Sequence, residues 1–251
     1  MLKVVLITGA SRGIGAEAAK LAASQGWAVA VNYCHRRDAA DAVVDAILAS
    51  GGIAQAIGAD VGEPEGVAHL FSVFDRTIGV KGRLAGLVNN AGIVAASSRI
   101  DAMNWERSER LLRVNTLGAL ACARESVKRM STRNGGSGGS IVNVSSAAAR
   151  LGSPGQYVDY AMSKAALETM SLGLAKEVAE EGIRVNTVRP GLIDTEIHAS
   201  GGDPGRLERL VASVPMRRSG RASEVAEAIV WLLGDAASYC TGSTLDVSGG
   251  R

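Results

Sequence analysis

The stretch KVVLIT at residues 3–8, followed at once by GASRGIG at residues 9–15, decides the fold of this chain. The first half is a short apolar and β-branched run of the kind that forms buried strands. Residues Ala16–Gln25 then follow a helical period and end at Gly26. The stretch therefore predicts a strand, a glycine-rich turn and a helix whose N-terminal N–H groups can bind a pyrophosphate.

Each glycine of this turn has its own expected role. Gly9 permits a sharp exit from the strand, and Gly13 lets the backbone approach a phosphate closely. Gly15 lets the helix pack against the sheet, and the spacing Gly13-x-Gly15-x-x-Ala18 fits a dinucleotide-binding pattern. The alternative is a glycine-rich turn that binds no ligand.

Strand and helix signals alternate along the rest of the chain. The strand candidates are Val4–Thr8, Ala28–Tyr33, Ala54–Gly58, Leu84–Asn89, Ser140–Val144, Arg184–Val188 and Thr244–Val247. The helix candidates between them are Asp38–Ser50, Pro64–Ile78, Trp105–Met130, Tyr160–Glu181 and Ser223–Leu233. This alternation predicts one α/β domain over residues 1–251, with a doubly wound parallel sheet of the Rossmann type and helices on both faces.

Composition and charge exclude several classes of function. A net charge of +2 gives no electrostatic case for a nucleic acid partner, and no apolar run is long enough to span a membrane. The first residues, MLKVVLITGA, do not resemble a signal peptide. Cys34, Cys122 and Cys240 are few and far apart, which is typical of reduced thiols in the cytoplasm. We therefore expect a cytoplasmic protein without a metal site.

Tyr160 and Lys164 are four residues apart in a predicted helix and so share one face. A nearby cation lowers the pKa of a phenol, and lowering it to near neutrality needs a shift of roughly 3 units, or about 4 kcal/mol. Such a tyrosine is a usable general acid or base. Tyr157 has Ala161 four residues on and no lysine, so it is not expected to act in this way. The alternative is an exposed Tyr160 and Lys164 on a solvated helix.

These motifs occur together, in this order, in the classical short-chain dehydrogenase/reductase family, which the chain resembles along its whole length. The segments that carry the resemblance are Thr8–Gly15, Asn89-Asn90-Ala91-Gly92, Val114-Asn115-Thr116-Leu117-Gly118, Ser145-Ser146, Tyr160 with Lys164, and Pro190-Gly191. The segment from Ser145 to Lys164 is most similar to the branch called glucose-1-dehydrogenase-like.

The resemblance implies four catalytic residues. Tyr160 would transfer a proton, and Lys164 would lower the tyrosine pKa and bind the nicotinamide ribose. Asn115 would hold a water in the proton route; the alternative is that it bends its helix through a local backbone hydrogen bond. Ser146 would orient the substrate oxygen. The spacing from Ser146 to Tyr160 is one residue longer than the family's, so Ser145 stays open as the alternative.

The resemblance also implies a set of residues that contact a dinucleotide. Pro190-Gly191 would redirect the chain over the cofactor, Ile193 and Thr195 would meet the nicotinamide carboxamide, and Asp60-Val61 would meet the adenine. A competing role for Asp60 is to start the next helix. The full expected set is Gly9, Ser11, Arg12, Gly13, Ile14, Gly15, Asn32, Tyr33, Arg36, Asp60, Val61, Asn90, Ala91, Gly92, Tyr160, Lys164, Pro190, Gly191, Ile193 and Thr195.

The end of the second strand indicates which dinucleotide binds. Proteins that prefer NAD place an acid there to hold the ribose 2′-OH, but residues 31–37 (VNYCHRR) contain none. Arg12, Arg36 and Arg37 can instead pair with a 2′-phosphate. We therefore expect NADP as the cofactor, with NAD as the alternative.

The sequence thus predicts an NADP(H)-dependent oxidoreductase that moves a hydride to or from a carbonyl or alcohol carbon of a small substrate, a sugar among the candidates. One alternative is a 3-oxoacyl-carrier-protein reductase that docks its carrier through Lys128, Arg129 and Arg133. A non-enzymatic alternative is an NADP-sensing regulator. Apolar residues lie on several sides of the helices from Trp105 and Tyr160, and the resemblance implies that such helices pair across two-fold axes. We therefore expect a homotetramer, with a dimer as the alternative. Glu196–Pro215 is expected to form a lid.

Overall fold

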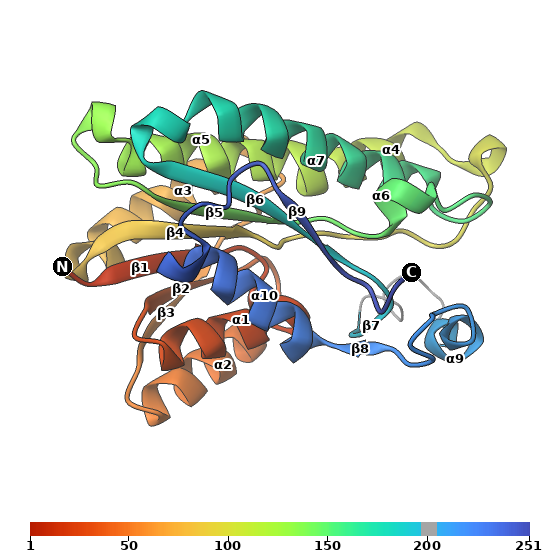
Figure 1. Ribbon diagram of the computed structural model, residues 1–251, viewed down its shortest axis with the longest axis horizontal. Coiled ribbons are helices and arrows are strands. Elements are labelled where there is room, and N and C mark those ends of the chain that lie inside the picture. Colours follow the sequence, from red (N-terminus) through yellow and green to blue (C-terminus); the bar gives the residue numbers. More distant parts are fainter. Residues whose placement is uncertain (197–204) are drawn as a thin grey trace.

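A seven-stranded parallel sheet runs through the computed structural model, which describes residues 1–196 and 205–251 (Figure 1). Its strands, in spatial order, are β3 (Ile53–Gly58), β2 (Ala28–Tyr33), β1 (Lys3–Ile7), β4 (Arg83–Asn89), β5 (Gly139–Val144), β6 (Ile183–Pro190) and β9 (Thr244–Val247). The chain moves outward from β1 to β3 and then returns to β4 on the other side of β1. The predicted doubly wound Rossmann-type sheet is confirmed.

Helices cover both faces of this sheet (Figure 1). On one face lie α1 (Gly13–Ser24), α2 (Arg37–Ala49) and α10 (Ala222–Leu233). On the other lie α3 (Pro64–Arg76), α4 (Trp105–Leu112), α5 (Ala119–Met130) and α7 (Val158–Glu177). Shorter elements are α6 (Ala148–Leu151), α9 (Arg206–Val211), and the paired β7 (Ile193–Asp194) and β8 (Gly220–Arg221).

Strand β1 shows why the sheet must be covered twice. Val5 and Ile7 belong to the core under α1 and α10, while Val4 and Leu6 belong to the core under α3 and α5. Successive side chains of a strand point to opposite faces, so a strand buried on both sides reads as a continuous apolar run. This is why the strands could be located in the sequence from short apolar runs such as KVVLIT at residues 3–8.

Two predicted helices differ from the structure. The expected helix Trp105–Met130 contains a π-helical segment at Arg113–Gly118. Gly118 lies so close to the turn after β3 that a Cβ at this position would clash with the Val61 carbonyl oxygen. Helix α7 spans Val158–Glu177, so it starts before the predicted Tyr160 and ends before the predicted Glu181. In its first turn the Asp159 carboxylate accepts a hydrogen bond from the Tyr160 N–H at 2.9 Å. Acidic side chains at this end of a helix are favourable.

The predicted lid falls partly outside the described residues. Residues 197–204 are not among them, and the remainder of the segment contains the short helix α9. Within the described part of the chain, no helix is both long and apolar enough to cross a bilayer.

Candidate active site

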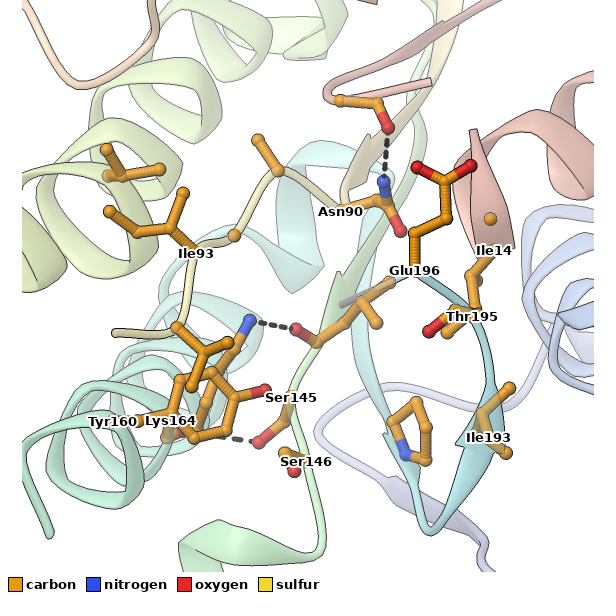
Figure 2. A pocket seen from close by; sticks show the side chains of 18 of the residues that line it. Ile14, Asn90, Ile93, Ser145, Ser146, Tyr160, Lys164, Ile193, Thr195 and Glu196 are labelled. Carbon is orange, nitrogen blue, oxygen red and sulfur yellow. Dashed lines mark hydrogen bonds between the residues drawn. The ribbon is translucent and has the colours of Figure 1, made fainter. Parts of the chain in front are cut away.

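A cavity of about 410 Å³ opens at the carboxyl ends of the strands, around the point where the strand order reverses between β1 and β4. Ligands of doubly wound sheets bind in this crevice. Figure 2 shows that its walls come from α1, from the turns after β4 and β5, from α7, and from the segment around β7. Motifs that are far apart in the sequence therefore meet in one space.

The turn after β1 requires glycine for two physical reasons. Gly9 has a φ of +61°, and a Cβ at this position would lie 2.8 Å from Ala91 Cα. A Cβ at Gly15 would lie 2.5 Å from Asn90 Nδ2. Gly15 thus permits close packing, and it does not line the cavity.

The turn after β1 and the turn after β4 hold each other through hydrogen bonds. Thr8 Oγ1 accepts from the N–H groups of Asn90 (3.1 Å) and Ala91 (3.0 Å). Asn90 Nδ2 donates to the carbonyl oxygens of Thr8 and Gly9, both at 2.9 Å. Asn32 continues this arrangement, because its Oδ1 accepts from the Gly9 N–H at 3.2 Å. The glycine-rich turn after β1 is therefore held in place by hydrogen bonds from Asn32 and from the turn after β4.

Tyr160 and Lys164 lie one turn apart on α7, with Lys164 Nζ 5.9 Å from the centroid of the tyrosine ring. Lys164 is buried, and its Nζ donates to the Val144 carbonyl oxygen at 2.8 Å (Figure 2). Desolvation by burial lowers the pKa of Lys164 to about 8. The predicted pairing of a phenol with an ammonium is thus present in the cavity wall, not on a solvated helix face.

The two serines after β5 have different hydrogen-bond partners. Ser145 Oγ is buried and donates to Glu168 Oε1 at 2.6 Å. Ser146 Oγ accepts from the Ala148 N–H at 3.2 Å, and no described residue accepts a proton from it. A hydroxyl has one proton to donate. The proton of Ser145 is therefore engaged, and Ser146 keeps its proton for a ligand.

Asn115 lies one layer behind the cavity wall and does not line it. Its Nδ2 donates to Ile93 O (3.0 Å) and Ser163 Oγ (3.0 Å), and its Oδ1 accepts from the Ile93 N–H (2.8 Å). The side chain does not bond to its own helix, although the helix is irregular here. Gly92 separates Asn115 from Lys164, since a Cβ at Gly92 would lie 3.5 Å from Asn115 Oδ1 and 3.2 Å from Lys164 Nζ.

Arginine side chains contribute to the cavity wall. Arg12 and Arg36 line the cavity, whereas Arg37 does not. All three form ion pairs: Arg12 with Glu196 at 2.8 Å, Arg36 with Asp38 at 3.4 Å and Arg37 with Asp41 at 3.4 Å. Asp60 lines the cavity, and its Oδ1 accepts from the Gly62 N–H at 2.9 Å in the turn before α3, whose N-cap is Glu63. Arg110, which the sequence did not indicate, donates to Asp60 Oδ2 at 3.2 Å.

Three of the predicted site residues do not line the cavity: Gly15, Tyr33 and Asn115. The ring of Tyr33 lies over Gly58 on the neighbouring strand, because a Cβ at Gly58 would be 3.0 Å from it. Arg37, considered for a 2′-phosphate, does not line it either, and all the remaining predicted residues do. The wall also contains residues outside the predicted set: Cys34, His35, Ala59, Ile93, Val94, Arg110, Val114, Val144, Ala147, Ala148, Leu151, Ser153, Tyr157, Leu192, Glu196 and Arg251.

Most of these additional residues adjoin a motif and could have been inferred from it. Tyr157 and Arg251 could not: Tyr157 was excluded as a catalytic tyrosine, yet it is buried in the wall, and Arg251 arrives from the far end of the chain. Among the described residues, no group of three or more His, Cys, Asp or Glu side chains is arranged to hold a metal ion.

Comparisons with known proteins agree with this geometry. A family model described as enoyl-(acyl carrier protein) reductase matches residues 9–251. The chain is 52% identical over 250 residues to the uncharacterized oxidoreductase YgfF of Escherichia coli, and the match covers 100% of both chains. It is 37% identical over 249 residues to a 3-oxoacyl-[acyl-carrier-protein] reductase of Synechocystis, covering 99% of this chain and 96% of the relative.

The crystal structure of the angucycline C-6 ketoreductase LanV with bound NADP superposes with a TM-score of 0.91 at 33% identity. The match covers 99% of this chain and 95% of LanV. Relatives of this identity and coverage share more than a fold, and the chain belongs to the short-chain dehydrogenase/reductase family of oxidoreductases.

Proposed function

We propose that this oxidoreductase uses NADP(H) to transfer a hydride to or from the carbonyl or alcohol carbon of a small substrate, acting as a single domain over residues 1–251. The observation that carries the proposal is one continuous cavity. It is lined by Arg12 and Arg36 at one end and by Ser146, Tyr160 and Lys164 further along. A dinucleotide and a small substrate need such a combination of anion-binding and proton-transferring groups.

The residues of the cavity fit a phosphorylated dinucleotide. The N-terminus of α1 at Gly13 and Ile14 faces the cavity and suits a pyrophosphate. Arg12 and Arg36 suit a 2′-phosphate, Asp60 and Val61 the adenine, and Ile193 and Thr195 the carboxamide. NADPH, when bound, supplies the hydride. The LanV structure contains NADP, which supports the same preference here, with NAD as the alternative.

The chain's own residues then handle the proton and the substrate oxygen. Tyr160 gives its proton to the oxygen of a carbonyl or takes one from an alcohol, and Ser146 donates a hydrogen bond to the same oxygen. The ammonium of Lys164 stabilises the phenolate, because a nearby positive charge favours the ionised form. Asn115 anchors the Ile93 backbone beside Lys164, where the resemblance places the solvent route for the proton.

Replacing Tyr160 by Phe should lower kcat by about 10²–10⁴-fold or more, because the proton donor is lost. The affinity for NADPH should stay nearly unchanged, since the phenol does not anchor the dinucleotide. NADPH oxidation with a panel of carbonyl substrates and a fluorescence titration of NADPH measure the two effects. The matched control is Tyr239→Phe, whose side chain is fully exposed. Near wild-type turnover by Tyr160→Phe would refute the mechanism.

Replacing Lys164 by Met should change how stability depends on pH. In the folded protein the Lys164 pKa is about 8, against 10.5 ordinarily, so the buried ammonium costs about 3 kcal/mol below pH 8. Between pH 8 and 10.5 the unfolded chain holds this proton and the folded protein does not, so stability rises with pH. Urea unfolding without cofactor should show wild type gaining about 3 kcal/mol relative to Lys164→Met across this range. A pH-independent difference would contradict the buried charge.

Replacing Arg36 by Ala should weaken NADPH binding by roughly 1.5–3 kcal/mol and leave NADH binding nearly unchanged, because a charge-assisted hydrogen bond to the 2′-phosphate is lost. Arg37→Ala is the matched control, since Arg37 is the adjacent residue but lies outside the cavity wall. Calorimetric titration with both cofactors measures the preference. Equal affinities of the wild-type protein for NADPH and NADH would overturn the proposed cofactor.

A 3-oxoacyl-carrier-protein reductase is the second candidate, because the chain is similar to proteins with this activity. The basic residues expected to dock the carrier give it no support. Lys128 pairs with Glu125, Arg129 with Asp75 and Glu125, and Arg133 with Glu181. They also lie before β5 in the chain, at the end of the sheet where the parallel strands begin, whereas the cavity lies where the strands end. Activity with acyl thioesters, compared with sugars of the glucose-1-dehydrogenase-like branch and simple ketones, separates the candidates.

A regulator that only senses NADP is the third alternative. It would need neither Ser146 with a free proton nor a tyrosine beside Lys164, whereas this cavity contains both. Turnover of any carbonyl substrate with NADPH would decide against it. A location in the cytoplasm accompanies the enzymatic proposal, since NADPH and small metabolites are its substrates.

A homotetramer is the proposed assembly. Apolar side chains are exposed in two places: Trp105, Leu117 and Leu120 along α4, the π-helical segment and α5, and Leu172 and Leu245 on α7 and β9. Two such surfaces, each covered by its own copy across a two-fold axis, give a closed tetramer. Light scattering at micromolar concentration should give four times the 25.8 kDa chain mass. A measured mass of one chain would contradict both proposed interfaces, and a mass of two chains would support only one of them.

A further inference from the structure

Behind the cavity wall, one carboxylate joins the ends of three elements. We call Ser145, Glu168, Arg189 and Asp246 the Glu168 cluster. Arg189 Nε and Nη2 donate to the two oxygens of Glu168 at 2.9 and 2.6 Å, and Arg189 Nη1 donates to Asp246 Oδ1 at 3.0 Å. Ser145 Oγ donates to Glu168 Oε1 at 2.6 Å. The side chains of Arg189 and Glu168 are only 14% and 19% exposed, so solvent weakens these contacts little.

Three members of the cluster adjoin a residue of the cavity wall. Ser145 precedes Ser146 at the end of β5, and Arg189 precedes Pro190 at the end of β6. Glu168 follows Lys164 by one turn of α7. Glu168, Arg189 and Asp246 do not line the cavity themselves. Ser145 is the one member of the cluster that lines the cavity, so the other three reach the reacting groups only through Ser145 and through their neighbours in the chain.

The geometry of the cluster makes it a rigid connection. A carboxylate that binds a guanidinium through both oxygens has a defined orientation. Ser145 has a second acceptor within reach, the Lys164 carbonyl oxygen, but it lies farther away, at 3.3 Å, and carries no charge (Figure 2). Arg150 Nη1 approaches Asp246 Oδ2 at 3.5 Å and balances the second acid. The charges are thus paired, and Ser145 is held by Glu168.

We propose that Glu168 is a positioning residue for the reaction: through Ser145 it fixes the hydroxyl of Ser146 relative to Tyr160 and Lys164. The inference rests on the proposed function. A hydrogen-bond donor to the substrate oxygen acts only from the correct place, and a displacement of about 1 Å can lower the rate by up to 10²-fold. The segment after β5 is also held by the backbone bond from the Ala147 N–H to Pro190 O, so a smaller loss is expected.

The test compares Glu168→Gln with Asp75→Asn. The matched control breaks the bidentate pair of Asp75 with Arg129, whose distances of 2.9 and 2.6 Å equal those of Glu168 with Arg189 but which lies outside the cavity wall. Hydrogen exchange should rise in peptides covering 144–148 and 189–193 of Glu168→Gln only. Its kcat should fall about 10-fold, with KM and the NADPH dissociation constant within about twofold of wild type.

Ser145→Ala gives a second, milder route to the same answer if Glu168→Gln folds poorly. It removes only the hydroxyl, and it should lower kcat by a similar factor; combined with Glu168→Gln, it should lower kcat no further. Unchanged exchange in both peptides would overturn the proposal. Raised exchange with unchanged kcat would mean that the cluster only holds the structure together, and it would overturn the positioning role. Absence of turnover by the wild-type protein would refute the proposed function, while the exchange comparison would still decide whether Glu168 holds both segments.

Discussion

The hydrogen bonds between the end of β1 and the end of β4 are the constraint on which the rest of the site depends. The ladder between these strands ends at Ile7 and Val88, and Thr8 and Asn90 extend it with side-chain bonds on both sides of the crevice. Because the strand order reverses here, a crevice opens between the two turns. These bonds therefore fix the distance between the glycine turn and the wall that leads to Asn115 and Lys164. A dinucleotide spanning the crevice needs that distance to be constant.

The burial of Lys164 in the active site lowers the stability of the folded protein. Burial of Lys164 lowers its pKa to about 8, which means that the folded protein holds a charge in an unfavourable place. Among the described residues, the Val144 carbonyl oxygen accepts a hydrogen bond from its ammonium at 2.8 Å. A lysine in this state is poised to bind hydroxyl groups, because its N–H donors have few partners within the protein. Local conflicts of this kind are expected where a chain binds ligands and not where it only folds.

Much of the fold and part of the site could be predicted from the sequence, and the reasons are local. Strands buried on both faces read as apolar runs, so KVVLIT and its equivalents marked the sheet within a residue or two. The glycine turn, Tyr160 and Lys164 follow from short spacings along the chain. Arg110 was missed because it reaches the adenine end from a helix 50 residues beyond Asp60. The sequence could not distinguish Arg36, which lines the cavity, from Arg37, which does not, because the difference depends on the direction in which each side chain points at the start of α2. The π-helical segment depends on contacts with Ile93 and Val61, which no helical period encodes.

That π-helical segment limits how the chain can vary in length. Residues Arg113–Gly118 are wound more widely than the helices on either side, so each residue rotates the chain by less than the roughly 100° of an α-helical residue. Removing a single residue here would restore a regular helix with little rotation of α5 relative to α4, but it would take Asn115 out of its position beside Ile93. Surface loops such as Asn134–Gly139 tolerate insertions and deletions without such a loss. Homologous sequences should therefore align across residues 113–118 without gaps, while their length differences collect in the loops.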